Sequence, residues 1–535
     1  MPSFQSILNM VSESFYKNKN DIEKNKTVIF NAMQKLQGEK YENEIDETFY
    51  KKISELILSN MDTIHGGLKG APKFPQFFLY EYLLKQYEKN SDNLFYDLSV
   101  KSIDQICSGG IYDHIGGGIS RYSVDQYWLV PHFEKMLYDN AQLIGILNSF
   151  WQLTKKEAYK NKIYETVDWL KKDMLDSSAA FYSSYDADSE GVEGKYYVWS
   201  YQELQKILGS DFLFFTKIFD VYENGNWEGS NVLSCSKNLH IENDDYSKLR
   251  QLINTLYDER IKRPKPTCDN KILCDWNGLA IDSIAKSSAI FRDDKLLNLA
   301  LQAFNFIKTS MYDGKTLYHS HCNSINKHDG MLEDYAYLIK AGITIFEITT
   351  DEQYLKFSLE LTETLIENFG DEEGMFFITS KMKDDVIIRN KQIVDNVMPN
   401  ANAVMIENLT KLDFITGEHK YNQLNTKIIQ DYSSRINKEY FGICSFLNSL
   451  DFFNNYQSII ITGINKDDNK KIYDQLIKIY LPNTIILMIN EKTNIISKND
   501  FLNQIKIKNQ SFIYLCKNNT CSLPSDSVEE ILKII

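Results

Sequence analysis

Residues 109–140 gather side chains that can donate and accept protons around a run of glycines. The segment contains His114, Arg121, His132 and Glu134, and its glycines are Gly116–Gly118. Glycines allow a backbone to bend sharply or to approach a ligand closely. Acids and bases beside them can supply acid–base catalysis and stabilise a developing oxyanion. The segment therefore predicts the floor of a ligand pocket; the alternative is a helix connection whose polar groups cap helices.

Two histidines of this segment suggest proton transfer on a sugar. Epimerisation or isomerisation uses bases placed around a sugar ring, and His114 and His132, each with an ordinary pKa of about 6.5, can remove and return a proton near neutrality. Arg121 or Lys73 would stabilise an enolate-like oxygen. Glu134 would orient His132, although two residues apart on a helix they would point to different faces.

A run of acids in the second quarter of the chain allows two interpretations. Asp186, Asp188 and Glu190, followed by Gly191, match the first half of a calcium-binding loop, but the position of the bidentate glutamate is occupied by Tyr197. The alternative is that these carboxylates project into the mouth of the fold and contact substrate hydroxyls. We assign Asp186 to substrate binding and assign no metal ion or cofactor.

Paired carboxylates predict a second reaction class, glycoside hydrolysis. Asp188 together with Glu228 or Asp334 would form the pair, at a separation that sequence does not give. Trp199 and Trp227 would offer flat apolar faces to a sugar ring.

The eight cysteines are scattered and contain no C-x-x-C pair, so we expect no disulfide framework. His319, His321 and Cys322 lie close together in sequence, and Cys268 and Cys274 are six residues apart. A zinc site would require them to meet in tetrahedral geometry. Buried thiols and a turn with two histidines are the simpler interpretation.

A repeat indicates how the chain is organised. Four segments align around a small residue, and an amphipathic helix follows each of them, at about 157–175, 294–311, 352–369 and 420–436. Each second helix runs into a short aromatic tag, at 179–184, 315–320, 374–379 and 438–443. Two earlier helix pairs are expected, 20–38 with 46–61 and 75–89 with 95–108. Six hairpins predict a mainly α protein, an (α/α)6 toroid around a central funnel, rather than an open solenoid.

Polar residues recur where the four aligned helices begin: Asp139, Asn277, Asp334 and Asn402. Some of them are expected to cap helices, as Asp and Asn commonly do. We expect Asp334 and Asn402 to line the funnel, and we place Trp276 and Asn277 in the substrate-binding set.

Two further segments complete the organisation. A partly β insertion is expected at about 176–274 within a toroid that spans 1–453, with a strand at KYYVWS. From 454 to 535 strands and helices alternate, which predicts a small α/β subdomain. It lacks a G-x-G-x-x-G run, so nucleotide binding has no support.

Composition narrows the class of partner. The net charge of −14 and the absence of a basic stripe argue against a nucleic-acid surface. No signal-peptide pattern and no apolar run of about 20 residues are present, so we expect no membrane partner and a cytoplasmic protein.

Longer motifs carry a family resemblance. APKFP (71–75), GGIYDHIGGG (109–118), VPHFEKMLYDNAQL (130–143), FYSSYDADSEG (181–191), NWEGSNVL (226–233), KILCDWNGL (271–279) and LEDYAYLI (332–339) resemble blocks of the thioredoxin-domain-containing family that includes spermatogenesis-associated protein 20. The resemblance implies a six-hairpin glycosidase-like toroid similar to N-acylglucosamine 2-epimerases. Members of that family usually begin with a thioredoxin-like domain, and this sequence opens where that domain would end.

These observations lead to one expected function and two alternatives. The expected function is a carbohydrate-active enzyme that abstracts a proton from a small sugar in the funnel. The alternatives are a glycoside hydrolase-like enzyme and a non-catalytic ligand-binding or adaptor protein that works with a thioredoxin-like domain on another chain. Fold alone does not decide among them.

Overall fold

The structure is a computed structural model that describes residues 2–38, 40–41, 45–235, 243–436, 442–491, 495–517 and 520–535. Among these residues, no helix combines the length and the apolar character that crossing a lipid bilayer requires.

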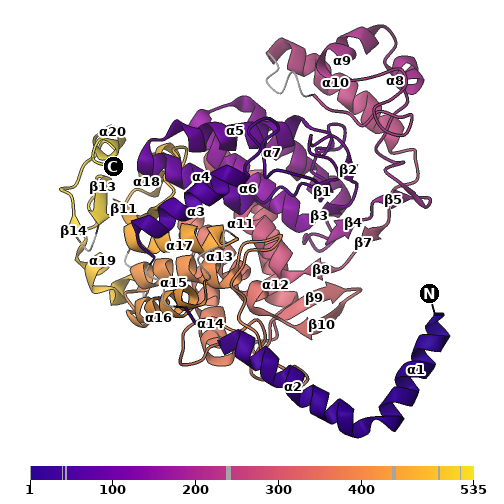
Figure 1. The fold of residues 1–535 in the computed structure, drawn as a ribbon. Coiled ribbons are helices and arrows are strands. Elements are labelled where there is room, and N and C mark those ends of the chain that lie inside the picture. The colour runs from indigo at the N-terminus through magenta and orange to yellow at the C-terminus, as the bar shows by residue number, and fades with distance from the viewer. Residues whose placement is uncertain are drawn as a thin grey trace.

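A closed ring of inner helices forms the centre of the molecule (Figure 1). Each inner helix packs against the next, and the last packs against the first; in ring order they are α4 (Phe77–Asn90), α6 (Leu137–Thr154), α11 (Cys274–Phe291), α13 (Leu332–Thr349), α15 (Ala401–Thr416) and α17 (Cys444–Asn455). Their chain-order partners lie outside them: α5 (Asn93–Ser108), α7 (Glu157–Trp169), α12 (Asp294–Ser310), α14 (Glu352–Phe369) and α16 (Lys420–Arg435). This double ring is the predicted (α/α)6 toroid.

The N-terminal helices differ from the prediction. Residues 20–38 belong to α2 (Lys19–Gly38), which together with α1 (Phe4–Lys17) extends away from the toroid (Figure 1). The predicted partner, α3 (Glu47–Asn60), packs on the two inner helices at the chain ends: Tyr50 contacts the Leu447 carbonyl of α17 and Ser54 contacts Tyr82 of α4. Helix α3 is thus the sixth outer helix, and α17 is an inner helix that the repeat did not reveal. Periodicity identified the apolar face of α3 but not the helix that covers it.

Buried asparagines explain why the aromatic tags recur. Asn277 accepts a hydrogen bond from the Phe181 N–H (2.8 Å) and donates to the Phe181 carbonyl (2.9 Å). Asn402 holds Phe376 through the same pair of bonds, at 2.8 and 3.0 Å. Each asparagine therefore fastens the tag that follows an outer helix to the next inner helix. This corrects the predicted ligand-binding role of Asn277 and Asn402. The tag at 438–443 lies largely outside the described residues.

We expect Asn277→Ala to lower the free energy of unfolding by about 2–3 kcal/mol, because the N–H and carbonyl of Phe181 would stay buried without partners. Urea denaturation measures the effect. Asn93→Ala, at an exposed position of α5, is the control and should change stability by less than about 0.5 kcal/mol. Equal effects of the two substitutions would contradict the role of Asn277 in holding Phe181.

The insertion forms a lobe beside the toroid (Figure 1). It contains β5 (Asp188–Ser189), β6 (Val192–Glu193), α8 (Tyr201–Leu208), α9 (Phe212–Ile218), α10 (Asn243–Arg260), and a separate apolar core that includes Phe215 and Leu256. The predicted strand at KYYVWS is a turn that ends in an isolated bridge between Trp199 and Asn231. Trp199 is fully buried, with the Arg263 guanidinium 3.9 Å from its ring centre. It therefore offers no face to a sugar.

Short strands gather where the inner helices begin. They are β1 (Tyr122–Ser123), β2 (Pro131–His132), β3 (Lys135–Met136), β4 (Ser184–Tyr185), β7 (Cys268–Asp269), β8 (Ile272–Leu273), β9 (Tyr318–Cys322) and β10 (Ile325–Asp329). They pair as β1–β2, β3–β4–β7 and β10–β9–β8. Because β3 leads directly into α6 and β8 directly into α11, these small sheets fix the first turn of both inner helices. We call this end of the toroid the mouth.

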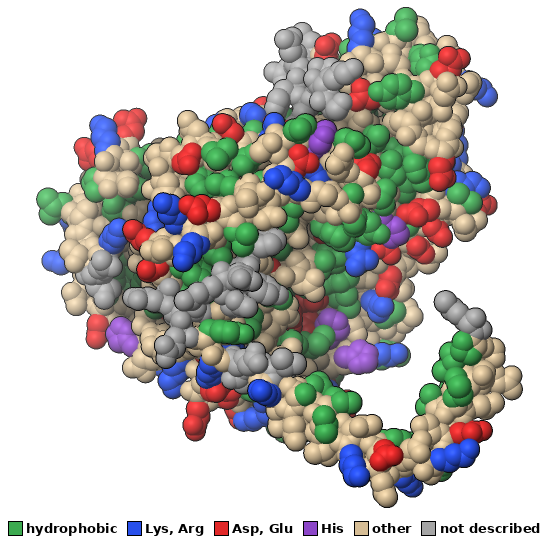
Figure 2. Space-filling model, in the orientation of Figure 1, with side chains coloured by type: hydrophobic (Ala, Val, Ile, Leu, Met, Phe, Trp, Pro, Cys, Tyr) green, Lys and Arg blue, Asp and Glu red, His purple; other side chains and the backbone are tan. Residues whose placement is uncertain are grey.

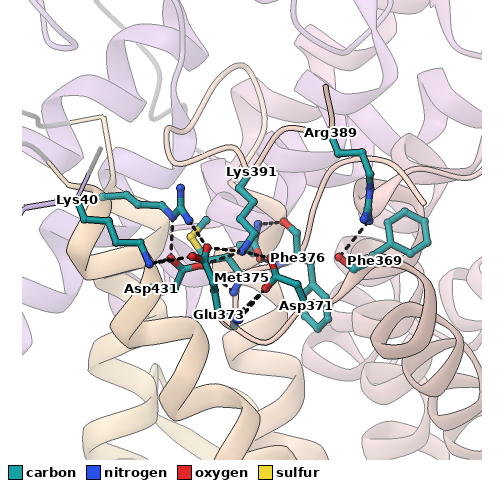
Figure 3. Close-up of polar contacts among 12 residues, drawn as sticks. Lys40, Phe369, Asp371, Glu373, Met375, Phe376, Arg389, Lys391 and Asp431 are labelled. Carbon is teal, nitrogen blue, oxygen red and sulfur yellow. Dashed lines mark hydrogen bonds and ion pairs between the residues drawn. The ribbon is translucent and has the colours of Figure 1, made fainter. Parts of the chain in front are cut away.

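Residues 370–400, between α14 and α15, contain no regular element, and they are held by a charge cluster (Figure 3). The ammonium of Lys391, 4% exposed, lies 2.7 Å from Asp371, 3.3 Å from Glu373 and 3.0 Å from Asp431 of α16. Farther along, the segment crosses part of the mouth, where its carbonyls accept hydrogen bonds from Gln142 of α6 (2.9 Å) and Tyr337 of α13 (2.5 Å).

The C-terminal segment forms the predicted α/β unit. Its sheet has the order β12 (Thr484–Ile489), β11 (Gln457–Thr462), β13 (Phe512–Lys517), β14 (Thr520–Cys521), with helices α18 (Lys466–Leu476), α19 (Asp500–Gln504) and α20 (Val528–Leu532). Strands β11 and β12 are parallel and α18 connects them. Cys516 and Cys521 form one local disulfide across β13 and β14, a bond that we did not expect.

Candidate active site

Polar side chains from several segments meet at the mouth. On the face in Figure 2, histidine and acidic side chains lie together over the β9–β10 hairpin and again near β4 and β5. They form two groups. The α6 mouth group consists of Arg121, His132, Glu134, Tyr138 and Asp139. The α11–α13 mouth group consists of Asp275, His319, Glu333 and Asp334.

Contacts link three members of the α6 mouth group, Arg121, Glu134 and His132, in a chain. Glu134 lies 3.1 Å from the Arg121 guanidinium and 3.4 Å from His132 Nε2. His132 Nδ1 lies 2.7 Å from Glu193 of the lobe, and the imidazole stacks on Tyr122. His132 is in β2 and Glu134 follows it in extended backbone, not in a helix, so side chains two residues apart share a face. The expected orientation of His132 by Glu134 is therefore sterically possible.

Asp139 is the most unusual member of the α6 mouth group. Its side chain is in the first turn of α6 and only 5% of the residue is exposed. Its Oδ2 has no hydrogen-bond partner among the described residues, and neither does Nε of Arg121, which is also buried. Burial raises the pKa of Asp139 well above its ordinary value, and Arg121 only partly opposes this. A buried acid that holds its proton can act as a general acid.

The α11–α13 mouth group is built on a histidine and an aspartate. His319 Nδ1 lies 3.0 Å from both carboxylate oxygens of Asp334, and Asp334 also accepts the backbone N–H of Asp275 (3.0 Å). The hydrogen bond to Asp334 raises the pKa of His319 to about 9. Burial and the Asp334 carboxylate raise the pKa of Asp275. Asp334 is fully buried and its Oδ2 accepts the Met331 N–H at the start of α13 (2.7 Å), so this residue caps the helix instead of lining an open funnel. Trp276 connects the groups, its ring 4.8 Å from that of Tyr138.

Two predicted site residues lie elsewhere in the core. His114 is 5% exposed, its Nε2 is 3.0 Å from the Gly109 carbonyl and its ring packs on Phe219. No contact joins it to His132 among the described residues. Lys73 is buried in an ion pair with Asp62 at 2.6 Å. Neither placement supports the predicted roles in proton abstraction and oxyanion binding.

The buried position of His114 predicts a pH dependence of stability. Burial lowers its pKa to about 3, so between pH 6.5 and 3 the unfolded chain binds a proton that the folded chain does not. Stability is therefore complete above about pH 6.5 and falls below it, by about 2 kcal/mol at pH 5. Urea denaturation at about pH 7.5 and pH 5 should show this fall, and His114→Gln should lack that part of it. An equal fall in stability in wild type and in His114→Gln would contradict the lowered pKa of His114. His328→Gln, at an exposed position, is the control and should behave as wild type does.

The glycine run is packed against protein rather than open to a ligand. A Cβ on Gly116 would lie 2.0 Å from the Arg260 guanidinium, and one on Gly117 would lie 2.2 Å from the Glu165 carbonyl. Gly118 has φ +80° and faces Trp169. The alternative, a structural connection, is therefore correct for these glycines: they permit close approach of the chain to itself.

The remaining predicted acids lie outside the two groups. Asp186, Asp188 and Glu228 are exposed, and Trp227 is half-buried against Phe133. Asp186, Asp188 and Glu190 do not belong to a group of three or more acids, cysteines or histidines that is close enough to share one ion, among the described residues. The calcium loop therefore has no support from their positions. The residues that do form such a group are Asp275, His319 and Asp334. The sequence pairing of His319 with His321 and Cys322 is not realised, since His321 instead contacts Asn326 and Phe306.

A cavity of about 290 Å³ lies inside the ring, beyond the segment that crosses the mouth. Ion pairs lie in its wall: Lys340 lies 2.8 Å from Glu407, and Lys286 lies 2.9 Å from Asp282. At its far end residues 477–482 of the C-terminal unit line it. Most of its charged side chains are held in ion pairs, whereas Asp139 Oδ2 at the mouth has no partner among the described residues, so we place the reacting groups at the mouth.

No catalytic or substrate-binding role was predicted for five members of the two mouth groups: Tyr138, Asp139, Asp275, His319 and Glu333. Asp139 was interpreted as a helix cap, Tyr138 and Asp275 were not singled out, and His319 was considered only for zinc. Their position in the repeat was the available signal. Asp139 and Asp275 both lie in the first turn of an inner helix, Asp139 two residues before Ala141 and Asp275 three residues before Gly278.

Comparison with known proteins agrees with the motifs. No protein-family model matches the chain. Spermatogenesis-associated protein 20 of Homo sapiens is 27% identical over 99% of this chain and 75% of its own length. An uncharacterized protein of Caenorhabditis elegans is 26% identical over 99% of this chain and 79% of its own. The resemblance inferred from the sequence motifs is confirmed.

Solved structures with low identity share parts of the arrangement. Cellobiose 2-epimerase from Bacillus thermoamylovorans (TM-score 0.48, 10% identity) covers 72% of this chain and 85% of its own. A D-mannose isomerase (TM-score 0.48, 10% identity) covers 73% and 87%, and an unsaturated glucuronyl hydrolase from a Bacillus species (TM-score 0.44, 9% identity) covers 75% and 93%. The ring of helix contacts, not these likenesses, establishes the toroid.

Proposed function

From the chemistry of its mouth, we propose that this chain is a carbohydrate-active enzyme that isomerises a small sugar by proton transfer. The observation that carries the proposal is the pair of buried atoms without partners, Asp139 Oδ2 and Arg121 Nε. The Asp139 carboxyl oxygen accepts a hydrogen bond when the acid is ionised and donates one when it is protonated, whereas Arg121 Nε donates a hydrogen bond. Unpaired buried polar groups are costly in a native fold. A hydroxyl or carbonyl of a sugar would satisfy both.

The proposed reaction gives one role each to His132, as the base, and to Asp139, as the acid. His132 removes the proton from the carbon beside the carbonyl of the open-chain sugar, and Asp139 protonates the carbonyl oxygen. The electrons of the broken C–H bond form the C=C bond of an enediol. His132 then returns its proton to the neighbouring carbon, the other hydroxyl proton passes to Asp139, and the product is the isomeric sugar. No oxidant or reductant is needed.

The remaining members orient these two groups. Glu193, at 2.7 Å from His132 Nδ1, holds the imidazole in place. Arg121 stabilises negative charge on the enediol oxygen. His132 is the one histidine of the α6 mouth group. A single base serves one face of the sugar, which favours interconversion of aldose and ketose over epimerisation by two bases.

The test is an NMR screen in D2O. Wild type, His132→Gln and the exposed control His328→Gln are incubated with aldoses, ketoses and small disaccharides. We expect wild type and His328→Gln to form the isomeric sugar with solvent deuterium on carbon, and His132→Gln to be at least about 100-fold slower.

Two other outcomes would redirect the assignment. New anomeric signals from a cleaved disaccharide, unaffected by His132→Gln, would contradict isomerisation and favour the paired-carboxylate alternative. Binding of a sugar without exchange or cleavage would contradict catalysis and favour the ligand-binding or adaptor alternative.

A further inference from the structure

We propose that Asp275, His319 and Asp334 bind one divalent transition-metal ion at the mouth. The inference goes beyond proton transfer by the α6 mouth group and does not depend on it.

Geometry supports a shared ion. The three side chains come from α11, β9 and α13, and one donor atom from each lies within 4.8 Å of the other two. His319 Nδ1 is 3.0 Å from either oxygen of Asp334. Ligands bound at about 2.0–2.2 Å to one ion are themselves about 3–3.5 Å apart. A small inward movement of Asp275 would complete the set.

The charges of the group support a cation. The carboxylate of Asp275 belongs to a residue that is only 5% exposed. The hydrogen bond that it accepts comes from the adjacent Trp276 N–H, at 2.8 Å. Asp334, fully buried, and Glu333 add two further acids, and His319 is the basic group in contact with them. A buried cluster with more acids than bases is costly, and a divalent ion would neutralise it.

The donor types narrow the ion. Imidazole together with carboxylates suits zinc, iron, cobalt, nickel or manganese, whereas magnesium and calcium prefer oxygen ligands alone. Asp334 is held in place by the backbone N–H groups of Met331 and Asp275, at 2.7 and 3.0 Å, so it presents its oxygens in a fixed direction. Preorganised ligands of this kind favour binding.

The experiment measures metal binding directly. The full chain is stripped with a chelator and titrated with Zn²⁺ by calorimetry and with Co²⁺ by visible absorption. We expect one ion per chain and Co²⁺ d–d bands that report nitrogen and oxygen ligands. His319→Ala and the isosteric Asp275→Asn should each weaken binding at least about 100-fold.

His321→Ala is the matched control, because His321 lies two residues away in β9 and contacts Asn326 rather than the acids. It should bind as wild type does, and so should Asp139→Asn, which separates this test from that of the proposed isomerase. Circular dichroism of each variant establishes that it is folded. Absence of Zn²⁺ and Co²⁺ binding by folded wild type, or unchanged binding by folded His319→Ala and Asp275→Asn, would overturn the inference.

Discussion

Asp139→Asn is expected to slow turnover by about 10²- to 10⁴-fold, the usual contribution of a general acid, while making the fold more stable. The same side chain has both effects because it is a buried acid without a hydrogen-bond partner at Oδ2. Its folded pKa is raised by burial, so its contribution to stability is complete below about pH 4 and is lost as the pH rises through that raised value. Asparagine carries no charge and avoids this loss.

Kinetics and thermal unfolding of the same preparation measure the two effects. The control is Asp188→Asn, an exposed acid of β5, which should change the unfolding free energy by less than about 0.5 kcal/mol. Activity of wild type should also fall as the pH rises through the pKa of Asp139, because the acid must be protonated to donate. An Asp139→Asn protein that is both active and less stable than wild type would refute the role of Asp139.

Asp113→Asn is expected to lower the free energy of unfolding by about 3–5 kcal/mol, as loss of one partner from a buried ion pair does. Asp113 accepts two hydrogen bonds from Arg260 at the end of α10, at 2.7 and 2.9 Å, and one from Lys135 at 2.6 Å. Both cations are almost fully buried and would be left without a carboxylate. Burial alone would raise the pKa of Asp113, but Arg260 and Lys135 hold it far below its ordinary value.

Urea denaturation measures the loss, and hydrogen exchange locates it. Because Arg260 ties the lobe to the loop at 113–118, amides of α8 and α9 should exchange faster in the variant. The stabilisation is present above about pH 4 and falls as the pH drops through the lowered pKa, so the difference between the proteins should narrow in acid. Lys262→Gln, in an exposed pair with Glu259, is the control. Equal stability of Asp113→Asn and Lys262→Gln would contradict the role of the Asp113–Arg260 ion pair in holding the lobe.

Much of the fold could be predicted because it depends on patterns of residues that are close together in the sequence. Apolar residues at helical spacing identified both helices of the hairpins from α4 to α16 and showed which face of each is buried. Short continuous apolar runs, such as IIIT at 459–462 and IILMI at 485–489, identified the C-terminal strands. The long motifs identified the resemblance to spermatogenesis-associated protein 20. None of these conclusions requires knowledge of which distant segments touch.

Tertiary packing decided the rest. The sequence did not show that α3 packs against α17. The contacting residues Tyr50 and Leu447 are 397 positions apart, and the apolar face of α3 could pack against any other apolar helix face. His114 and His132 look equivalent in the sequence, yet one is sealed by Phe219 and the other lies between two carboxylates. Asp275, His319 and Asp334 become neighbours only because α11 and α13 are adjacent in the ring. The sequence by itself determined the helices, their buried faces and the resemblance to spermatogenesis-associated protein 20. The tertiary structure decided which polar groups meet, because long-range packing, not local spacing, sets the distance between them.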